Sequence, residues 1–150
     1  MTKEVLLTIS GVQSDAHAQH MDQIEPVEVI TPAEYYFRDN MHYLLYDEVD
    51  PDDHELSHNI LTMKDNYMCM VRKGSTQTRL VIESGKRNVT YYATPFGSLH
   101  ILLDGRHVEV ESSEQEIDAV AGYGLEINYE NVADCLIRIR VQPRDTVLHL

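Results

Sequence analysis

The sequence predicts an all-β protein: a single closed antiparallel up-and-down β-barrel of about ten strands, with residues 1–150 as one domain. Three observations predict it. Short runs alternate apolar and polar residues with a period of two, turn-forming residues separate these runs at regular intervals, and no segment of ordinary helix length has a helical period. Because most runs follow one another as hairpins, closing the sheet is the simplest way to remove its two edges.

Six strands are predicted in the first half of the chain. They are alternating runs between turn signals, over residues 3–12, 26–37, 41–48, 55–64, 67–73 and 77–83. Polar residues 14–25 have no periodicity, which predicts a loop or a short irregular helix. Pro32 interrupts its strand and indicates an edge or a bulge, because proline has no N–H for a neighbouring strand. Asp39 and Asn40 predict a tight turn, since both tolerate left-handed backbone angles.

The second half predicts further strands over residues 87–94, 98–103, 106–111, 115–129 and 132–141. A turn at Asp104-Gly105 completes an antiparallel meander over residues 78–111. Gly122 and Gly124 lie opposite the apolar face of the longest run, where we expect the strand to bend or bulge. Glu130-Asn131 predicts the turn into the last strand.

Three runs are apolar on both faces, at residues 43–46, 67–71 and 101–103. A strand that is buried on both sides needs a cover on its outer face. The sequence leaves three covers open: the polar segment 14–25, the C-terminal tail, or a second subunit.

The charge and composition exclude several classes of partner. The net charge is −13, and Arg38 is the only basic residue between Lys3 and Lys64, so we expect neither nucleic acid nor an anionic membrane to bind. No apolar run reaches the roughly 18 residues of a membrane span. The N-terminal residues lack the apolar core of a signal peptide. Cys69 and Cys135 lie in apolar strand patterns typical of buried free thiols, which predicts a cytoplasmic location.

No motif predicts a catalytic site, a bound metal or a cofactor. His54 and His58 fall in a strand pattern, which places them too far apart to share one metal ion. The carboxylates of residues 47–55 lack the central glycine of a calcium loop, so we expect a solvated acidic loop. The sequence also lacks a nucleophile elbow and a phosphate-binding glycine loop followed by a helix.

Tyrosines and two arginines are the candidates for ligand binding. The chain has nine tyrosines and no tryptophan, and tyrosine suits both barrel packing and ligand pockets, packing being the commoner role for any one of them. Tyr36 and Tyr92 are the candidates among them. Arg138 and Arg140 alternate with the apolar residues of their strand. They therefore lie in solvent or, if that face lines a wet lumen, bind an anion.

Residues 91–97, Tyr-Tyr-Ala-Thr-Pro-Phe-Gly, resemble the Tyr-x-Thr-Pro-Tyr/Phe-Gly segment of the uncharacterised bacterial YwiB-like family. Residues 10–13, 33–37 and 71–74 also match, in the same order, so the resemblance covers nearly the whole chain. It implies a calycin-like β-barrel, similar in architecture to lipocalins. It implies no activity and no catalytic residues, because none is established for the family.

Three functions remain open. The leading one is a small-molecule-binding barrel without catalytic activity, because a barrel of about eight or more strands can enclose one small ligand. The alternative is a packed barrel whose two-sided strands form a homodimer or a protein-interaction surface. The third is an enzyme for a small anionic substrate, with tyrosine and arginine at the barrel mouth. A filled lumen, an exposed apolar patch or a cleft of titratable groups would distinguish them.

Overall fold

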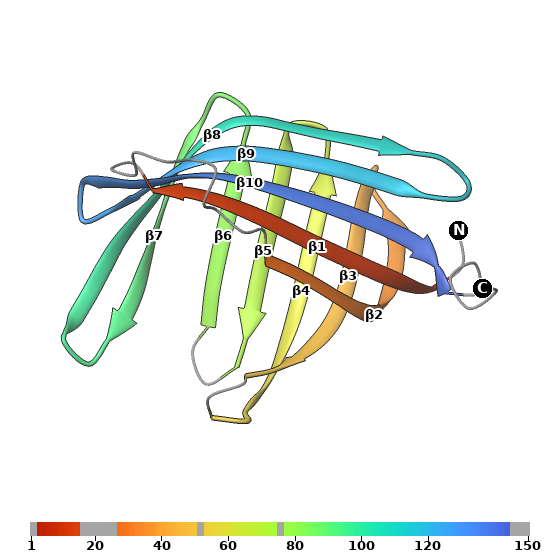
Figure 1. Ribbon diagram of the computed structural model, residues 1–150, viewed down its shortest axis with the longest axis horizontal. Coiled ribbons are helices and arrows are strands. Elements are labelled where there is room, and N and C mark those ends of the chain that lie inside the picture. The colour runs from red at the N-terminus through yellow and green to blue at the C-terminus, as the bar shows by residue number, and fades with distance from the viewer. Residues whose placement is uncertain (1–2, 16–26, 51–52, 75–76, 145–150) are drawn as a thin grey trace.

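The computed structural model describes residues 3–15, 27–50, 53–74 and 77–144, and these form ten antiparallel strands (Figure 1). The strands are β1 (Glu4–Asp15), β2 (Val27–Arg38), β3 (Met41–Val49), β4 (Leu56–Lys64), β5 (Tyr67–Lys73), β6 (Gln77–Glu83), β7 (Arg87–Thr94), β8 (Gly97–Ser112), β9 (Ile117–Ile127) and β10 (Glu130–Pro143). The predicted all-β fold is confirmed. Of the segment predicted as a loop or helix, residues 14 and 15 extend β1, and residues 16–25 lie outside the described chain.

The strands form one sheet in the order β6-β5-β4-β3-β2-β1-β10-β9-β8-β7. It curls into a nearly closed barrel, joined by the long β1–β10 pairing from Val5↔Pro143 to Asp15↔Ala133. Its edges are β6 and β7, which follow one another in sequence but diverge in space (Figure 1). The prediction of a continuous meander over residues 78–111 is therefore wrong at this step. At the seam between β6 and β8, Gly85 N donates to Gly105 O and Gly105 N donates to Lys86 O, both at 2.9 Å. Farther along β8, Val108 O accepts from Asn66 N at 3.0 Å and Val110 N donates to Asp65 Oδ1 at 3.0 Å, in the β4–β5 turn.

The predicted turn at Asp104-Gly105 is wrong, because β8 runs straight through it. A register shift between Gly105 and His107 instead forms a bulge in β8, opposite Gly122 and Tyr123 of β9. Position 105 must be glycine because the backbone of β8 passes close to the end of β6 here. A Cβ on Gly105 would overlap the backbone carbonyl of Glu83. Glycine lets two backbones approach closely and commonly marks a bulge. The bulge that we expect near Gly122 therefore occurs in β8, the strand that pairs with β9 at Gly122.

The turn between β9 and β10 lies at Asn128-Tyr129, two residues before the predicted Glu130-Asn131. Both residues have positive φ, 49° and 70°, as a two-residue hairpin turn of type I′ requires. Asn128 is fixed there by His100, because its backbone N donates to His100 O at 2.8 Å and its Oδ1 accepts from His100 N at 3.0 Å. This contact to β8 is tertiary, so the local sequence does not reveal it.

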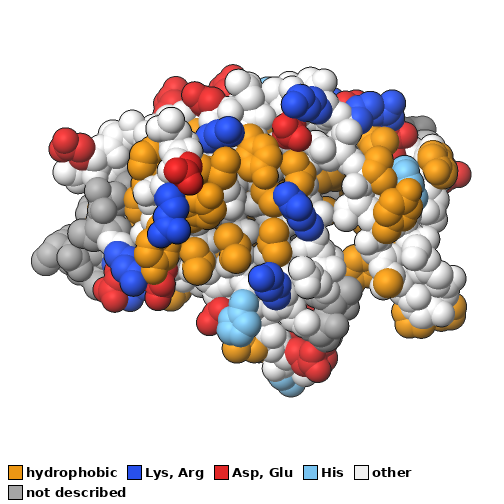
Figure 2. Space-filling model, turned by 180° about the vertical axis from the view of Figure 1, so that it is seen from behind, with side chains coloured by type: hydrophobic (Ala, Val, Ile, Leu, Met, Phe, Trp, Pro, Cys, Tyr) orange, Lys and Arg blue, Asp and Glu red, His pale blue; other side chains and the backbone are white. Residues whose placement is uncertain are grey.

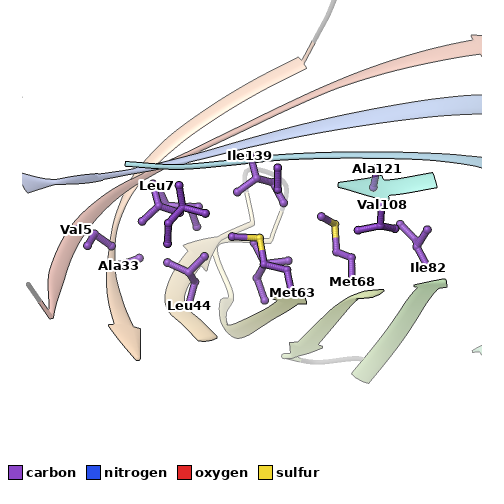
Figure 3. Packing of buried hydrophobic residues seen from close by; sticks show 14 of the residues in the cluster. Val5, Leu7, Ala33, Leu44, Met63, Met68, Ile82, Val108, Ala121 and Ile139 are labelled. Atoms are coloured by element: carbon purple, nitrogen blue, oxygen red, sulfur yellow. The ribbon is translucent and has the colours of Figure 1, made fainter. Parts of the chain in front are cut away.

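Apolar side chains fill the barrel along one row of every strand except β7 (Figure 3). The fully or nearly buried members of this core are Val5, Leu7, Ala33, Leu44, Leu61, Met63, Met68, Ile82, Leu103, Val108, Ile117, Ala119, Ala121, Ile139 and Val141. The apolar rows of the first strand and of the long run 115–129 face this core, since Val5, Leu7, Ile117, Ala119 and Ala121 belong to it. Cys69 is buried as predicted and Cys135 is half-buried.

Apolar side chains also cross the outer face of β3–β6, as the two-sided runs predicted (Figure 2). They alternate with the core residues and are partly exposed, and they include Tyr43, Leu45, Ile60, Val71 and Val81. No described segment forms a further layer over them. We refer to these residues as the outer apolar band.

His42 is a buried histidine whose neutral form the fold favours. It is 8% exposed, and its Nδ1 lies 2.8 Å from the Tyr35 hydroxyl oxygen. Burial lowers the pKa of His42 below its usual 6.5, and the Asp65 carboxylate partly opposes this shift. The unfolded chain therefore binds this proton more readily than the folded one, so acidification through about pH 6.5 destabilises the fold.

The prediction for His42 is a difference in pH dependence. The free energy of unfolding of the natural protein should fall more steeply between about pH 7.5 and about pH 5.5 than that of the His42→Gln variant. Urea denaturation of both proteins at each pH measures it. Parallel curves would show that His42 has the same pKa in both states.

Candidate functional site

The inward-facing row of β3–β6 changes from apolar to polar at one end of the barrel. Strand register places Tyr46 opposite Asn59, Glu48 opposite Ser57, and Arg72 opposite both Asn59 and Thr78. Ser57 and Asn59 are 2% and 7% exposed, whereas the side chains of Glu48 and Arg72 are 36% and 42% exposed, so this polar end is buried at Ser57 and Asn59 and open to solvent at Arg72. We call Tyr46, Glu48, Ser57, Asn59, Arg72 and Thr78 the polar layer.

Hydrogen bonds and ion pairs hold the polar layer together. Asn59 Nδ2 donates to Ser57 Oγ at 3.4 Å, and Ser57 Oγ donates to Glu48 O at 3.3 Å. Arg72 lies 3.7 Å from carboxylate oxygens of both Glu48 and Asp50. Burial raises the pKa of Tyr46 to about 12, with Glu48 adding to the shift and Arg72 opposing it. The Tyr46 hydroxyl therefore stays neutral at ordinary pH and is available to hydrogen-bond a ligand.

A cleft opens in the barrel wall where β2 and β3 separate. They pair only from Glu34↔Leu45 to Arg38↔Met41. Tyr35 N donates to Lys3 O, on the β1 side. Successive residues of a strand direct their backbone nitrogens to opposite sides, so the nitrogen of Pro32 faces β3. Because proline has no N–H, it donates no hydrogen bond to β3. The predicted interruption at Pro32 is thus the point beyond which β2 and β3 are no longer paired.

This side cleft has a volume of about 580 Å³. Its wall consists of residues 31–34, 45–47 and 58–60, together with Lys73 and Arg144. Tyr46 and Asn59 of the polar layer are among these residues, so the cleft leads from the outer surface to the buried polar end of the barrel.

A second cavity of about 280 Å³, the end pocket, lies at the mouth of the barrel. Asp50, Asp53, Glu55 and Leu56 line it from the β3–β4 connection, and Ser57, Arg72, Gly74, Thr78 and Tyr92 complete it. Asn59 in the side cleft is hydrogen-bonded to Ser57 in the end pocket. The two cavities therefore approach one polar layer from two directions.

The four predicted ligand-binding residues occupy three separate places. Tyr92 lines the end pocket. Tyr36 lies on the outer surface, where its hydroxyl donates to Glu34 Oε2 at 2.9 Å and Lys3 Nζ sits 5.1 Å from its ring centroid.

Arg138 and Arg140 lie on the outer face, on either side of the buried Ile139. Arg140 Nε contacts Glu116 Oε1 at 2.9 Å and Asp118 Oδ1 at 3.2 Å. Both arginines line an outer groove of about 670 Å³ that also contains Glu109. The structure therefore brings neither arginine to the barrel interior.

Sequence reasoning missed Tyr46, Ser57, Asn59 and Arg72. A signal for them exists: they continue the alternating rows of Leu44, Leu61 and Met70 by one or two further positions. Using this signal requires knowing which face of each strand points inward. The sequence does not show this, because neighbouring residues on opposite faces, such as Leu44 and Leu45, are equally apolar. The polar end becomes visible only once register aligns the four strands.

Three further features bear on function. Within the described ranges, no three His, Cys, Asp or Glu side chains cluster in a way that would hold a metal ion. His58 is exposed, and its Nδ1 lies 2.6 Å from Asp47 Oδ1. The described residues contain no helix long and apolar enough to cross a membrane.

Comparisons with known proteins identify the fold and a family. Residues 9–139 match a domain of unknown function, DUF1934. The crystal structure of the YwiB protein from Bacillus subtilis superposes with a TM-score of 0.70 at 18% sequence identity, covering 91% of this chain and 90% of that chain. No curated protein matches the chain. At this identity, the likeness to YwiB shows a shared fold.

Proposed function

Because the chain belongs to the DUF1934 family, a domain of unknown function, we propose its role from geometry: it binds a small polar molecule at the polar end of the barrel. The observation that supports this most is the convergence of the side cleft and the end pocket on one polar layer, in which Ser57 and Asn59 are buried. Apolar walls with a few fixed polar groups are typical of ligand sites, and a cavity of about 300–1,000 Å³ suits one small molecule.

The surroundings of the site support a role for these residues in binding a ligand, in addition to a role in stabilising the fold. Buried polar groups cost free energy unless they are hydrogen-bonded, so an apolar layer would stabilise the barrel more simply. The net charge of −13 supports a small ligand rather than nucleic acid or an anionic membrane. The two free thiols support a cytoplasmic role.

A second candidate function is protein interaction, including homodimerisation. The tip of the β7–β8 hairpin and the adjacent β9–β10 turn expose Tyr91, Phe96 and Tyr129, which are 69%, 100% and 78% exposed. With the outer apolar band, they give the surface apolar areas of the kind that marks interfaces.

Native mass spectrometry of the protein purified from its own host tests both functions. Under the binding proposal, the spectrum shows excess mass that is lost on gentle activation. The Asn59→Leu variant should lose most of this excess, because it removes a polar group from the floor of the side cleft. Asn131→Leu, at an exposed position on β10, is the matched control and should keep it.

A monomer or dimer mass with nothing bound would contradict the binding proposal. A ligand-free dimer would favour the interaction function instead.

A further inference from the structure

The acidic and the basic side chains of the side cleft differ in whether they have a partner among the described residues. Its two carboxylates already have partners: Glu34 accepts from the Tyr36 hydroxyl at 2.9 Å, and Asp47 lies 2.6 Å from His58. Its cations Lys73 and Arg144 form no ion pair within the described part of the chain. Arg144 Nε is moreover buried and has no hydrogen-bond partner there.

A buried guanidinium nitrogen without an acceptor is unusual, because leaving such a donor unsatisfied costs more than an ordinary hydrogen bond contributes. Arginine and lysine commonly satisfy such donors with carboxylate or phosphate oxygens. Among the described residues of the cleft, the carboxylates are thus paired, and the Arg144 guanidinium is the group without an acceptor.

We propose that the side cleft binds the anionic group of its ligand, a carboxylate or a phosphate, between Lys73 and Arg144. This inference rests on the proposed binding function and specifies the chemistry of its ligand. The remaining surfaces fit the rest of such a molecule. Pro32, Leu45 and Ile60 offer apolar contacts along the wall, and the Tyr46 hydroxyl and Asn59 offer neutral hydrogen bonds at the floor.

Benzoate, phenyl phosphate and the neutral benzamide test the proposal, since all three carry one aromatic ring. Binding is followed by amide chemical shifts of residues 45–47 and 58–60 in nuclear magnetic resonance titrations. At least one anion should bind about tenfold more tightly than benzamide, the effect expected for charge-assisted hydrogen bonds. The tighter of the two anions identifies the ligand as a carboxylate or a phosphate.

The Lys73→Gln and Arg144→Gln variants should each weaken that binding by about tenfold. Lys64→Gln is the matched control, because Lys64 lies on the outer face of β4 and lines none of the cavities described above, so binding should be unchanged. Benzamide binding as tightly as both anions, no anion binding in the cleft, or unchanged binding in both variants would each overturn the proposal.

The two proposals fail in distinguishable ways. If the Lys73→Gln and Arg144→Gln variants still carry all the excess mass of the natural protein, the cleft binds a ligand and the anion assignment is wrong. If the natural protein carries no excess mass and none of the three probes shifts the cleft amides, binding and anion recognition are both wrong.

Discussion

Replacing Leu44 with alanine is expected to lower the free energy of unfolding by about 2–5 kcal/mol. Leu44 is 0% exposed and packs in the core opposite Leu61 of β4. Its truncation removes apolar contacts and leaves a cavity that the close-packed barrel fills only in part. Urea denaturation followed by circular dichroism measures the loss.

The adjacent leucine is the matched control for this prediction. Leu45 belongs to the outer apolar band and is 36% exposed, so Leu45→Ala should cost less than about 1 kcal/mol. Equal losses, or a larger loss at Leu45, would mean that β3 is rotated by one residue. Such a slip exchanges the two faces of the strand and would also remove Tyr46 from the barrel interior.

Replacing Gly105 with alanine is expected to cost about 3 kcal/mol, near the upper end for steric overpacking. The added Cβ would overlap the Glu83 carbonyl and separate the strands at the seam. Two hydrogen bonds depend on this approach, Gly85 N to Gly105 O and Gly105 N to Lys86 O. Faster hydrogen exchange at these two amides should accompany the loss of stability.

Gly11→Ala is the control, because the nearest atom to a Cβ at this position of β1 is Leu136 O at 3.9 Å. Its effect should stay within about 0.5 kcal/mol. If Gly105→Ala is as well tolerated as Gly11→Ala, then β6 and β8 do not meet at this glycine and the barrel is more open than described.

The strands could be predicted from the sequence because a strand that is buried on one side has a period of two. The alternation of Leu7 and Ile9 with the polar Thr8 requires no tertiary information. Similarly, the missing N–H of Pro32 is a local property, and its consequence, the end of β2–β3 pairing, follows directly.

The predictions from sequence are wrong where a contact between residues far apart in sequence overrides the preference of the local sequence. Asp104-Gly105 has the composition of a turn, but Gly105 serves a close backbone approach to Glu83, twenty-two residues earlier in sequence. The turn at Asn128 depends on His100, and the separation of β6 from β7 depends on the curvature of the whole sheet. Such contacts leave no periodic trace in the sequence.

The candidate site could be predicted only in part for a related reason. Tyr92 was identified as a ligand-binding candidate, and the structure places it in the end pocket. The polar layer was missed because its residues come from four strands and look like ordinary polar positions in each. Arg138 and Arg140 are candidates in the sequence because they alternate with apolar residues, whereas Arg72, which precedes Lys73 at the end of β5, is the arginine that faces inward.

A crystal structure of the protein purified from its own host tests the central claim most directly. We expect electron density for one small molecule in the side cleft, in contact with Tyr46 and Asn59 and with an acidic group near Lys73 and Arg144. Density for a ligand in the outer groove beside Arg138 and Arg140, or a side cleft that holds only water, would contradict it.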